Sequence, residues 1–121
     1  MKRNLIVEDQ PDIRKLIRMS LELGNHEVYE AYDGPEGLNL ALTLKPDLVL
    51  LDIMMPGGMD GLAVCRRLKI EAHPPLVVLL TARGQTADLA AGREAGADDY
   101  LVKPFSPLQL IDTIDRLTAT A

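Results

Sequence analysis

The chain has 121 residues with a formal net charge of −5, and 47% of them are hydrophobic, so it can bury the core of one domain. A single cysteine, Cys65, excludes an internal disulfide and a cysteine-rich metal site. Direct binding of nucleic acid is not expected, because such binding depends on basic residues and aromatic stacking, and this chain is acidic with no tryptophan and one phenylalanine.

Five segments of the sequence have the pattern of strands. In chain order they are residues 4–7 (NLIV), 26–31 (HEVYEA), 48–51 (LVLL), 76–80 (LVVLL) and 100–102 (YLV). Four are continuous apolar runs, which are typical of strands buried on both faces of a parallel sheet. The second alternates and is predicted to be an edge strand. No run is long enough to span a membrane, and the apolar stretch 5–7 is too short for a signal peptide, so a cytoplasmic location is expected.

Helices are predicted between and after these strands, over residues 11–23, 35–44, 61–70, 86–95 and 107–117. The first begins with Pro11 and ends before Gly24, and these residue types are preferred at the start of a helix and just beyond its end. Strand and helix therefore alternate along the whole chain. This order predicts an α/β fold with a single doubly wound, five-stranded parallel sheet and helices on both of its faces.

Polar residues end four of the predicted strands. Glu8 and Asp9 follow the first strand, Asp52 the third, Thr81 the fourth and Lys103 the fifth. In an open parallel sheet the carboxyl ends of the strands lie along one edge, where ligands bind. We therefore expect three carboxylates, one hydroxyl and one ammonium group to converge, although they come from distant parts of the sequence.

The chemistry of such a cluster follows from its charges. Carboxylates held about 4–6 Å apart repel one another, which raises their pKa values or requires a cation. Oxygen ligands of this kind suit Mg²⁺, which binds through one or two carboxylates, several waters and phosphate. A lysine and a threonine beside the ion would hold other oxygens of a phosphoryl group during in-line transfer. The pattern predicts a carboxylate nucleophile that forms an aspartyl-phosphate.

Four motifs carry a resemblance to a known family: LIVEDQPDIR, PDLVLLDIMMPG, VVLLTA and GADDYLVKPFSPLQL. With these motifs the chain resembles the receiver domain of two-component response regulators from about residue 3 to residue 117. The resemblance implies a flavodoxin-like sheet with strand order 2-1-3-4-5. Residues 1–121 are accordingly expected to form a single receiver domain, with residues 118–121 a frayed end or the start of a linker.

The resemblance implies a phosphoacceptor and a metal site. Asp52 would be the phosphoacceptor. Mg²⁺, or Mn²⁺ in its place, would be bound directly by Asp9 and Asp52, through water by Glu8, and by the backbone carbonyl of Met54. The three acidic residues are those that the strand ends already single out, and Met54 is added by the family alone.

The resemblance also implies residues that bind the phosphoryl group and act as a switch. Thr81 and Lys103 would each hold a phosphoryl oxygen, and the small Ala82 would leave the approach to the acceptor open. Tyr100 would be the aromatic residue that turns inward when Thr81 moves toward the phosphate. The Lys103–Pro104 bond matches a peptide bond that is cis in the family.

The implied function is that of a phosphorylation-activated signalling switch. A sensor histidine kinase or a phosphotransfer protein would phosphorylate the domain, and the face formed by the fourth helix, fifth strand and fifth helix would then control a downstream protein or output domain. Met54 and Arg83 would tune how long the phosphate survives. The domain would catalyse only its own phosphorylation and dephosphorylation, so it is not expected to be an enzyme. We expect a monomer or a weak phosphorylation-dependent dimer, with no direct nucleic-acid or membrane partner.

Two features depart from the family pattern. The loop PGGMDG has one glycine more than the usual motif, at Gly57 or Gly58, and an added glycine loosens a loop. On the output face, Leu89, Ala91 and Thr113 stand where the winged-helix transcription-factor branch has basic residues that pair across a dimer. These replacements argue against that dimer and leave a face with Leu89 and Ala91 for a different partner.

Three other functions share this fold class. An aspartyl phosphatase or phosphotransferase would require Asp-x-Asp, but Met54 stands two residues after Asp52. A flavin- or nucleotide-binding domain is opposed by the acidic first loop EDQPD, which has no glycine. A degenerate receiver would act only as a docking module, which the complete set of site residues opposes. Simpler roles also stay open for single residues: Asp9 as a helix cap, Thr81 as an ordinary strand residue and Tyr100 as part of the core.

Overall fold

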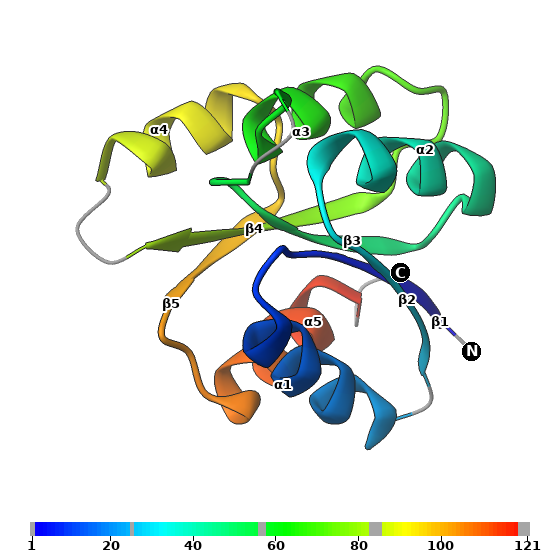
Figure 1. Ribbon diagram of the computed structural model, residues 1–121, viewed down its shortest axis with the longest axis vertical. Helices are drawn as coiled ribbons and strands as arrows, with labels where there is room; N and C mark the ends of the chain where they lie inside the picture. The colour runs from blue at the N-terminus through cyan, green and yellow to red at the C-terminus, as the bar shows by residue number, and fades with distance from the viewer. Residues whose placement is uncertain (1, 25, 56–57, 83–85, 119–121) are drawn as a thin grey trace.

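Five parallel strands form the central sheet of the structure, a computed structural model that describes residues 2–24, 26–55, 58–82 and 86–118. The strands are β1 (Lys2–Val7), β2 (His26–Ala31), β3 (Leu48–Asp52), β4 (Leu76–Ala82) and β5 (Asp99–Lys103). Their order is β2-β1-β3-β4-β5, and every neighbouring pair is parallel. The structure thus confirms the predicted strand order and places the alternating segment, β2, at an edge of the sheet (Figure 1).

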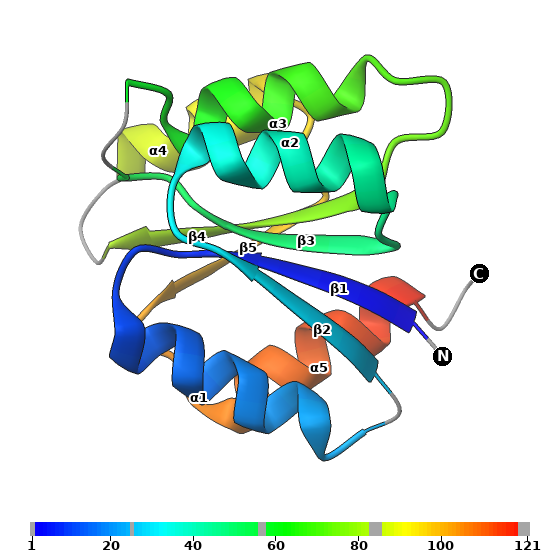
Figure 2. The same cartoon turned by 45° about the vertical axis from the view of Figure 1, so that its right-hand side comes forward.

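Helices cover both faces of this sheet. In the described part of the chain they are α1 (Pro11–Glu22), α2 (Gly34–Leu44), α3 (Gly61–Lys69), α4 (Thr86–Glu94) and α5 (Pro107–Thr118). One face is covered by α1 and α5, and the other by α2, α3 and α4 (Figures 1 and 2). This arrangement confirms the doubly wound fold that the alternation of strands and helices predicts.

Proline and aspartate residues fix the starts of three helices. α1 begins with Pro11, whose missing N–H needs no partner at this position. The side chain of Asp33 accepts a hydrogen bond from the Glu36 N–H at the start of α2, and that of Asp60 accepts one from the Ala63 N–H at the start of α3. The cap at Asp60 fixes where the loop after β3 must end.

The first strand begins two residues earlier than predicted, at Lys2 instead of Asn4. Lys2 and Arg3 lie opposite His26 and Glu27 of the edge strand β2, whereas the pairing of β1 with β3 begins at Asn4. Because an edge strand leaves its surroundings open to water, polar residues are tolerated there. The apolar pattern therefore marks only the part of β1 that lies between two neighbours.

Apolar side chains form one buried cluster on each face of the sheet. On the side of α2, α3 and α4, the strand residues of this cluster are Leu5, Val7, Ala31, Val49, Leu51, Val77 and Leu79. On the side of α1 and α5 they are Ile6, Leu48, Leu50, Val78, Leu80 and Leu101. Successive side chains of a strand point to opposite faces, so burial of both faces requires the continuous apolar runs of the sequence.

The central strand β3 is buried along its whole length, including Asp52 at its carboxyl end, which is 5% exposed. The carboxyl ends of β1, β3, β4 and β5 lie along one edge of the sheet, at the left of Figure 2. The core therefore holds the polar residues at these strand ends in fixed relative positions. Within the described residues, no helix is long and apolar enough to cross a membrane.

Candidate functional site

Three carboxylates meet at the edge of the sheet. Glu8 and Asp9 follow β1, and Asp52 is the last residue of β3. One carboxylate oxygen from each lies within 4.8 Å of those of the other two. Because β1 and β3 are neighbouring parallel strands, their carboxyl ends coincide, and the sequence prediction of an acidic cluster at this edge agrees with the structure.

Lys103 at the end of β5 supplies the positive charge of the cluster. Its Nζ lies 2.6 Å from Oε1 of Glu8 and 3.3 Å from Oδ2 of Asp52. The Lys103–Pro104 peptide bond is cis. One ammonium group therefore faces two buried carboxylates, with the carboxylate of Asp9 close by.

The buried Glu8 carboxylate is the most perturbed acid of the site. Its pKa is raised to about 8, chiefly by burial and then by the neighbouring Asp52, while Lys103 opposes this shift. Among the described residues, its Oε1 has no hydrogen bond of acceptable geometry, although the Lys103 ammonium lies at ion-pair distance. A buried acceptor oxygen beside two further carboxylates is a donor set suited to Mg²⁺ or Mn²⁺, so these residues fit such an ion.

Two groups orient the Asp52 carboxylate. The backbone N–H of Met54 donates a hydrogen bond to Oδ1 at 3.3 Å, and Lys103 lies on the side of Oδ2. The Met54 side chain is 67% exposed, so it does not pack in the core. Asp52 is thus held by a local turn on one side and by the end of β5 on the other, and its side chain is largely buried.

A cleft opens above these carboxylates, and it reaches the end of β4. It is lined by Asp9, Gln10, Asp52, Met54, Thr81, Ala82 and Lys103, together with apolar residues. The Thr81 hydroxyl is buried and donates to the carbonyl of Ala82 at 3.2 Å. The cleft therefore brings together six predicted site residues, Asp9, Asp52, Met54, Thr81, Ala82 and Lys103, whereas Glu8, Tyr100 and Pro104 do not line it. It also adds Gln10, which its place directly after the acidic pair could have indicated.

Comparison with known proteins decides the family. The family model described as "Response regulator receiver domain" matches residues 5–115. The chain belongs to this receiver domain family. This membership argues against a phosphatase and against a flavin-binding domain. It does not distinguish an active receiver from a degenerate one.

Relatives and solved structures of receiver domains agree with this assignment. The chain is 44% identical to the transcriptional regulatory protein ResD of Bacillus subtilis, over 97% of this chain and 48% of that protein. It is 42% identical to the DNA-binding dual master transcriptional regulator RpaA of Synechocystis, over 97% of this chain and 49% of the relative. The crystal structure of the receiver domain of NtrX from Brucella abortus superposes with a TM-score of 0.90 at 32% identity, covering 98% of this chain and 99% of that one. The receiver domain thus spans about half the length of these curated relatives.

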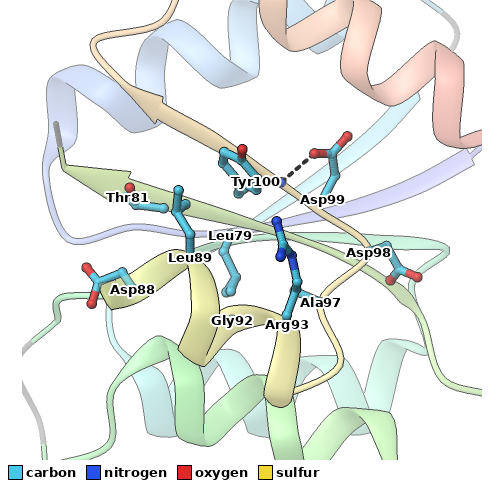
Figure 3. A pocket seen from close by; sticks show the side chains of 10 residues that line it. All are labelled: Leu79, Thr81, Asp88, Leu89, Gly92, Arg93, Ala97, Asp98, Asp99 and Tyr100. Carbon is cyan, nitrogen blue, oxygen red and sulfur yellow. Dashed lines mark hydrogen bonds between the residues drawn. The ribbon is translucent and has the colours of Figure 1, made fainter. Parts of the chain in front are cut away.

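Tyr100 lies outside the cleft, on β5. It is 42% exposed and lines a separate pocket between β4, β5 and α4, together with Thr81, Leu89 and Gly92 (Figure 3). Gly92 lets α4 approach the sheet, because a Cβ at this position would lie 2.7 Å from Cδ1 of Leu79. Thr81 therefore lines both the cleft and this pocket, which makes it the shared residue of the two.

Three further predictions from the sequence concern Arg83, the extra glycine and Thr113. Arg83 and Gly57 lie outside the described residues, whereas Gly58 has a φ of +78°, a conformation that favours glycine. Thr113 is 5% exposed, and its hydroxyl donates to the carbonyl of Gln109 within α5. Thr113 therefore faces the core and does not contribute to the expected face with Leu89 and Ala91.

Proposed function

We propose that this receiver domain is a phosphorylation-activated switch whose acceptor is Asp52. The observation that carries the proposal is the convergence of Glu8, Asp9 and Asp52 with the ammonium group of Lys103 3.3 Å from Asp52. A structural role would not require two neighbouring buried carboxylates, Glu8 and Asp52, because burying a charge is costly. A site for a cation and a phosphoryl group accounts for all four residues together.

In this proposal the metal would be held by Asp9 and Asp52, by Glu8 through water, and by the carbonyl of Met54. Mg²⁺ or Mn²⁺ would neutralise charge on the phosphoryl oxygens. A carboxylate oxygen of Asp52 attacks the phosphorus of a phosphohistidine on the kinase. As the new P–O bond forms, the P–N bond breaks and its electron pair stays on the histidine nitrogen. Lys103, paired with Asp52 in the structure, would then stabilise an oxygen of the transferred group.

The proposed response begins at Thr81. Its hydroxyl bonds only to a neighbouring carbonyl among the described residues, so it is free to exchange that bond for a phosphoryl oxygen. Ala82 would leave room for the phosphoryl group, and Tyr100 would turn toward the pocket beneath α4. This would change the face formed by α4, β5 and α5. Met54 and Arg83 would tune the lifetime of the phosphate.

The proposed partners follow from this mechanism. A sensor histidine kinase or a phosphotransfer protein would phosphorylate the domain, and a downstream protein or output domain would bind the altered face. The domain would act on no substrate beyond its own Asp52, in the cytoplasm, as a monomer or a weak dimer. The relative RpaA is described as DNA-binding, but for this acidic segment the absence of direct nucleic-acid contact stays a prediction.

Intact-mass measurement tests the proposal. The protein is incubated with Mg²⁺ and a small phosphodonor such as acetyl phosphate, and we expect the mass of one added phosphoryl group. Asp52→Asn should lose this addition, whereas the matched control Asp33→Asn, which changes the helix-capping aspartate of α2, should keep it. No added mass in the wild type, or an equal addition in Asp52→Asn, would refute the proposal and favour a degenerate receiver.

A further inference from the structure

Arg14 of α1 contacts the backbone of both acidic residues that follow β1. A single guanidinium nitrogen, Nη1, donates to the carbonyl of Glu8 at 2.8 Å and to that of Asp9 at 3.1 Å. The side chain is 16% exposed, so these bonds are largely shielded from water. Arg14 therefore fixes two successive peptide units of the loop that carries the two residues, without touching either carboxylate.

The guanidinium group is itself held from the opposite side. Its Nε lies 3.3 Å from Oε1 of Glu30 on β2, and its central carbon lies 4.3 Å from the centroid of the Tyr32 ring. The backbone N–H of Arg14 donates to the carbonyl of Gln10, the next residue of the same loop. The position of the guanidinium thus depends on α1 and β2, which are parts of the scaffold and not of the site.

We propose that Arg14 is a positioning residue for the metal ion, an inference that rests on the proposed function. Carboxylate side chains bind a metal well only when their backbone aims them correctly, and groups that orient ligands contribute strongly to metal affinity. The charge of Arg14 acts in the opposite direction, because a cation near the site repels a second cation. Loss of the two backbone hydrogen bonds should raise the Kd for Mg²⁺, whereas loss of the positive charge should lower it. The sign of the change in Kd therefore identifies the role of Arg14.

Arg18 offers a matched control on the same helix. Its Nε lies 2.6 Å from Oε2 of Glu30, so it shares the acidic partner of Arg14. Its backbone contact is with the carbonyl of Val28 in β2 and not with the metal-binding loop. Arg18→Ala removes the same charge and disturbs the same ion-pair network, but it leaves the carbonyls of Glu8 and Asp9 bonded.

The decisive measurement is the Kd for Mg²⁺, obtained by NMR titration of backbone amide shifts. We expect Arg14→Ala to raise this Kd by about 10–100-fold, Arg14→Lys to recover part of the loss, and Arg18→Ala to leave it within about twofold. An unchanged or lower Kd in Arg14→Ala would overturn the inference, and so would an equal rise in Arg18→Ala. If the wild type itself binds no Mg²⁺, the proposed function fails together with this inference. If the wild type binds Mg²⁺ but Arg14→Ala and Arg18→Ala change the Kd equally, only the inference about Arg14 fails and the proposed function stands.

A metal-free measurement separates positioning from general loss of stability. In EDTA, amide hydrogen exchange at Glu8 and Asp9 should accelerate in Arg14→Ala and in Arg14→Lys, while exchange at Leu50 in β3 should change little. Uniform acceleration across the sheet would mean that Arg14 only stabilises the fold. Arg14→Lys keeps the charge and most of the side-chain packing, so it provides the test if Arg14→Ala does not fold.

Discussion

Replacing Glu8 by glutamine should change how the stability of the metal-free protein depends on pH. Burial and the neighbouring Asp52 raise the pKa of Glu8 from 4.5 to about 8. Between these pH values the folded state holds a proton that the unfolded chain releases, so the free energy of unfolding falls as the pH rises. At about 1.4 kcal/mol per pH unit, the raised pKa corresponds to a loss of about 5 kcal/mol across this window. The stabilisation is complete below pH 4.5 and lost above about pH 8.

Urea unfolding in EDTA, followed by circular dichroism, measures this dependence. Glutamine does not titrate, so the difference between wild type and Glu8→Gln isolates the contribution of Glu8. The control Glu71→Gln, which changes a partly exposed carboxylate paired with Arg67 on α3, should follow the wild-type slope. Saturating Mg²⁺ should remove the wild-type fall, because a metal ion favours the ionised carboxylate. Parallel pH profiles of wild type and Glu8→Gln in EDTA would refute the reasoning.

Two further predictions concern the core, and a third concerns the loop after β3. Burial raises the pKa of the Cys65 thiol to about 11, so at neutral pH a thiol reagent should label the folded protein far more slowly than the urea-unfolded protein; rapid labelling of the folded protein would contradict this. Gly37→Ala should lower the free energy of unfolding by about 1–3 kcal/mol, because the new Cβ would lie 2.6 Å from Cγ1 of Val7. Gly58→Ala, in open space at a φ of +78°, should cost about 1–2 kcal/mol through backbone strain alone. The fall in urea midpoint caused by Gly58→Ala should be the same with and without Val7→Ala, whereas the fall caused by Gly37→Ala should be smaller when Val7→Ala is present.

The meeting of the three carboxylates could be predicted from the sequence because it follows from topology. Once β1 and β3 are parallel and adjacent, Asp52 must lie near Glu8 and Asp9. The pairing of Lys103 could not be predicted in the same way. Its Nζ lies closer to Glu8 than to Asp52, and this choice depends on side-chain reach and on the path of β5, neither of which leaves a periodic pattern in the sequence.

The contact between α1 and the acidic loop after β1 could not be predicted from the sequence either. Arg14 and Arg18 are one helical turn apart, and both pair with Glu30, so the helical pattern treats them alike. Only the distance of each from the start of the helix decides which one reaches the carbonyls of the loop. Likewise, Thr113 looks like a surface residue by its polarity, but the rotation of α5 turns it inward, where its hydroxyl bonds within the helix.

The burial of β3 on both faces has a mechanical consequence. A phosphate on Asp52 would add negative charge at the end of a strand that has partners on both sides and apolar cores above and below. Such a strand resists displacement. Any structural change is therefore expected in the elements of the sheet that have fewer neighbours. β5 has a neighbouring strand on one side only, and a pocket lies between it, α4 and β4. In the proposed function, chemistry would therefore occupy the buried centre of the sheet and recognition its edge, so that partner specificity could diverge while the acceptor stays unchanged.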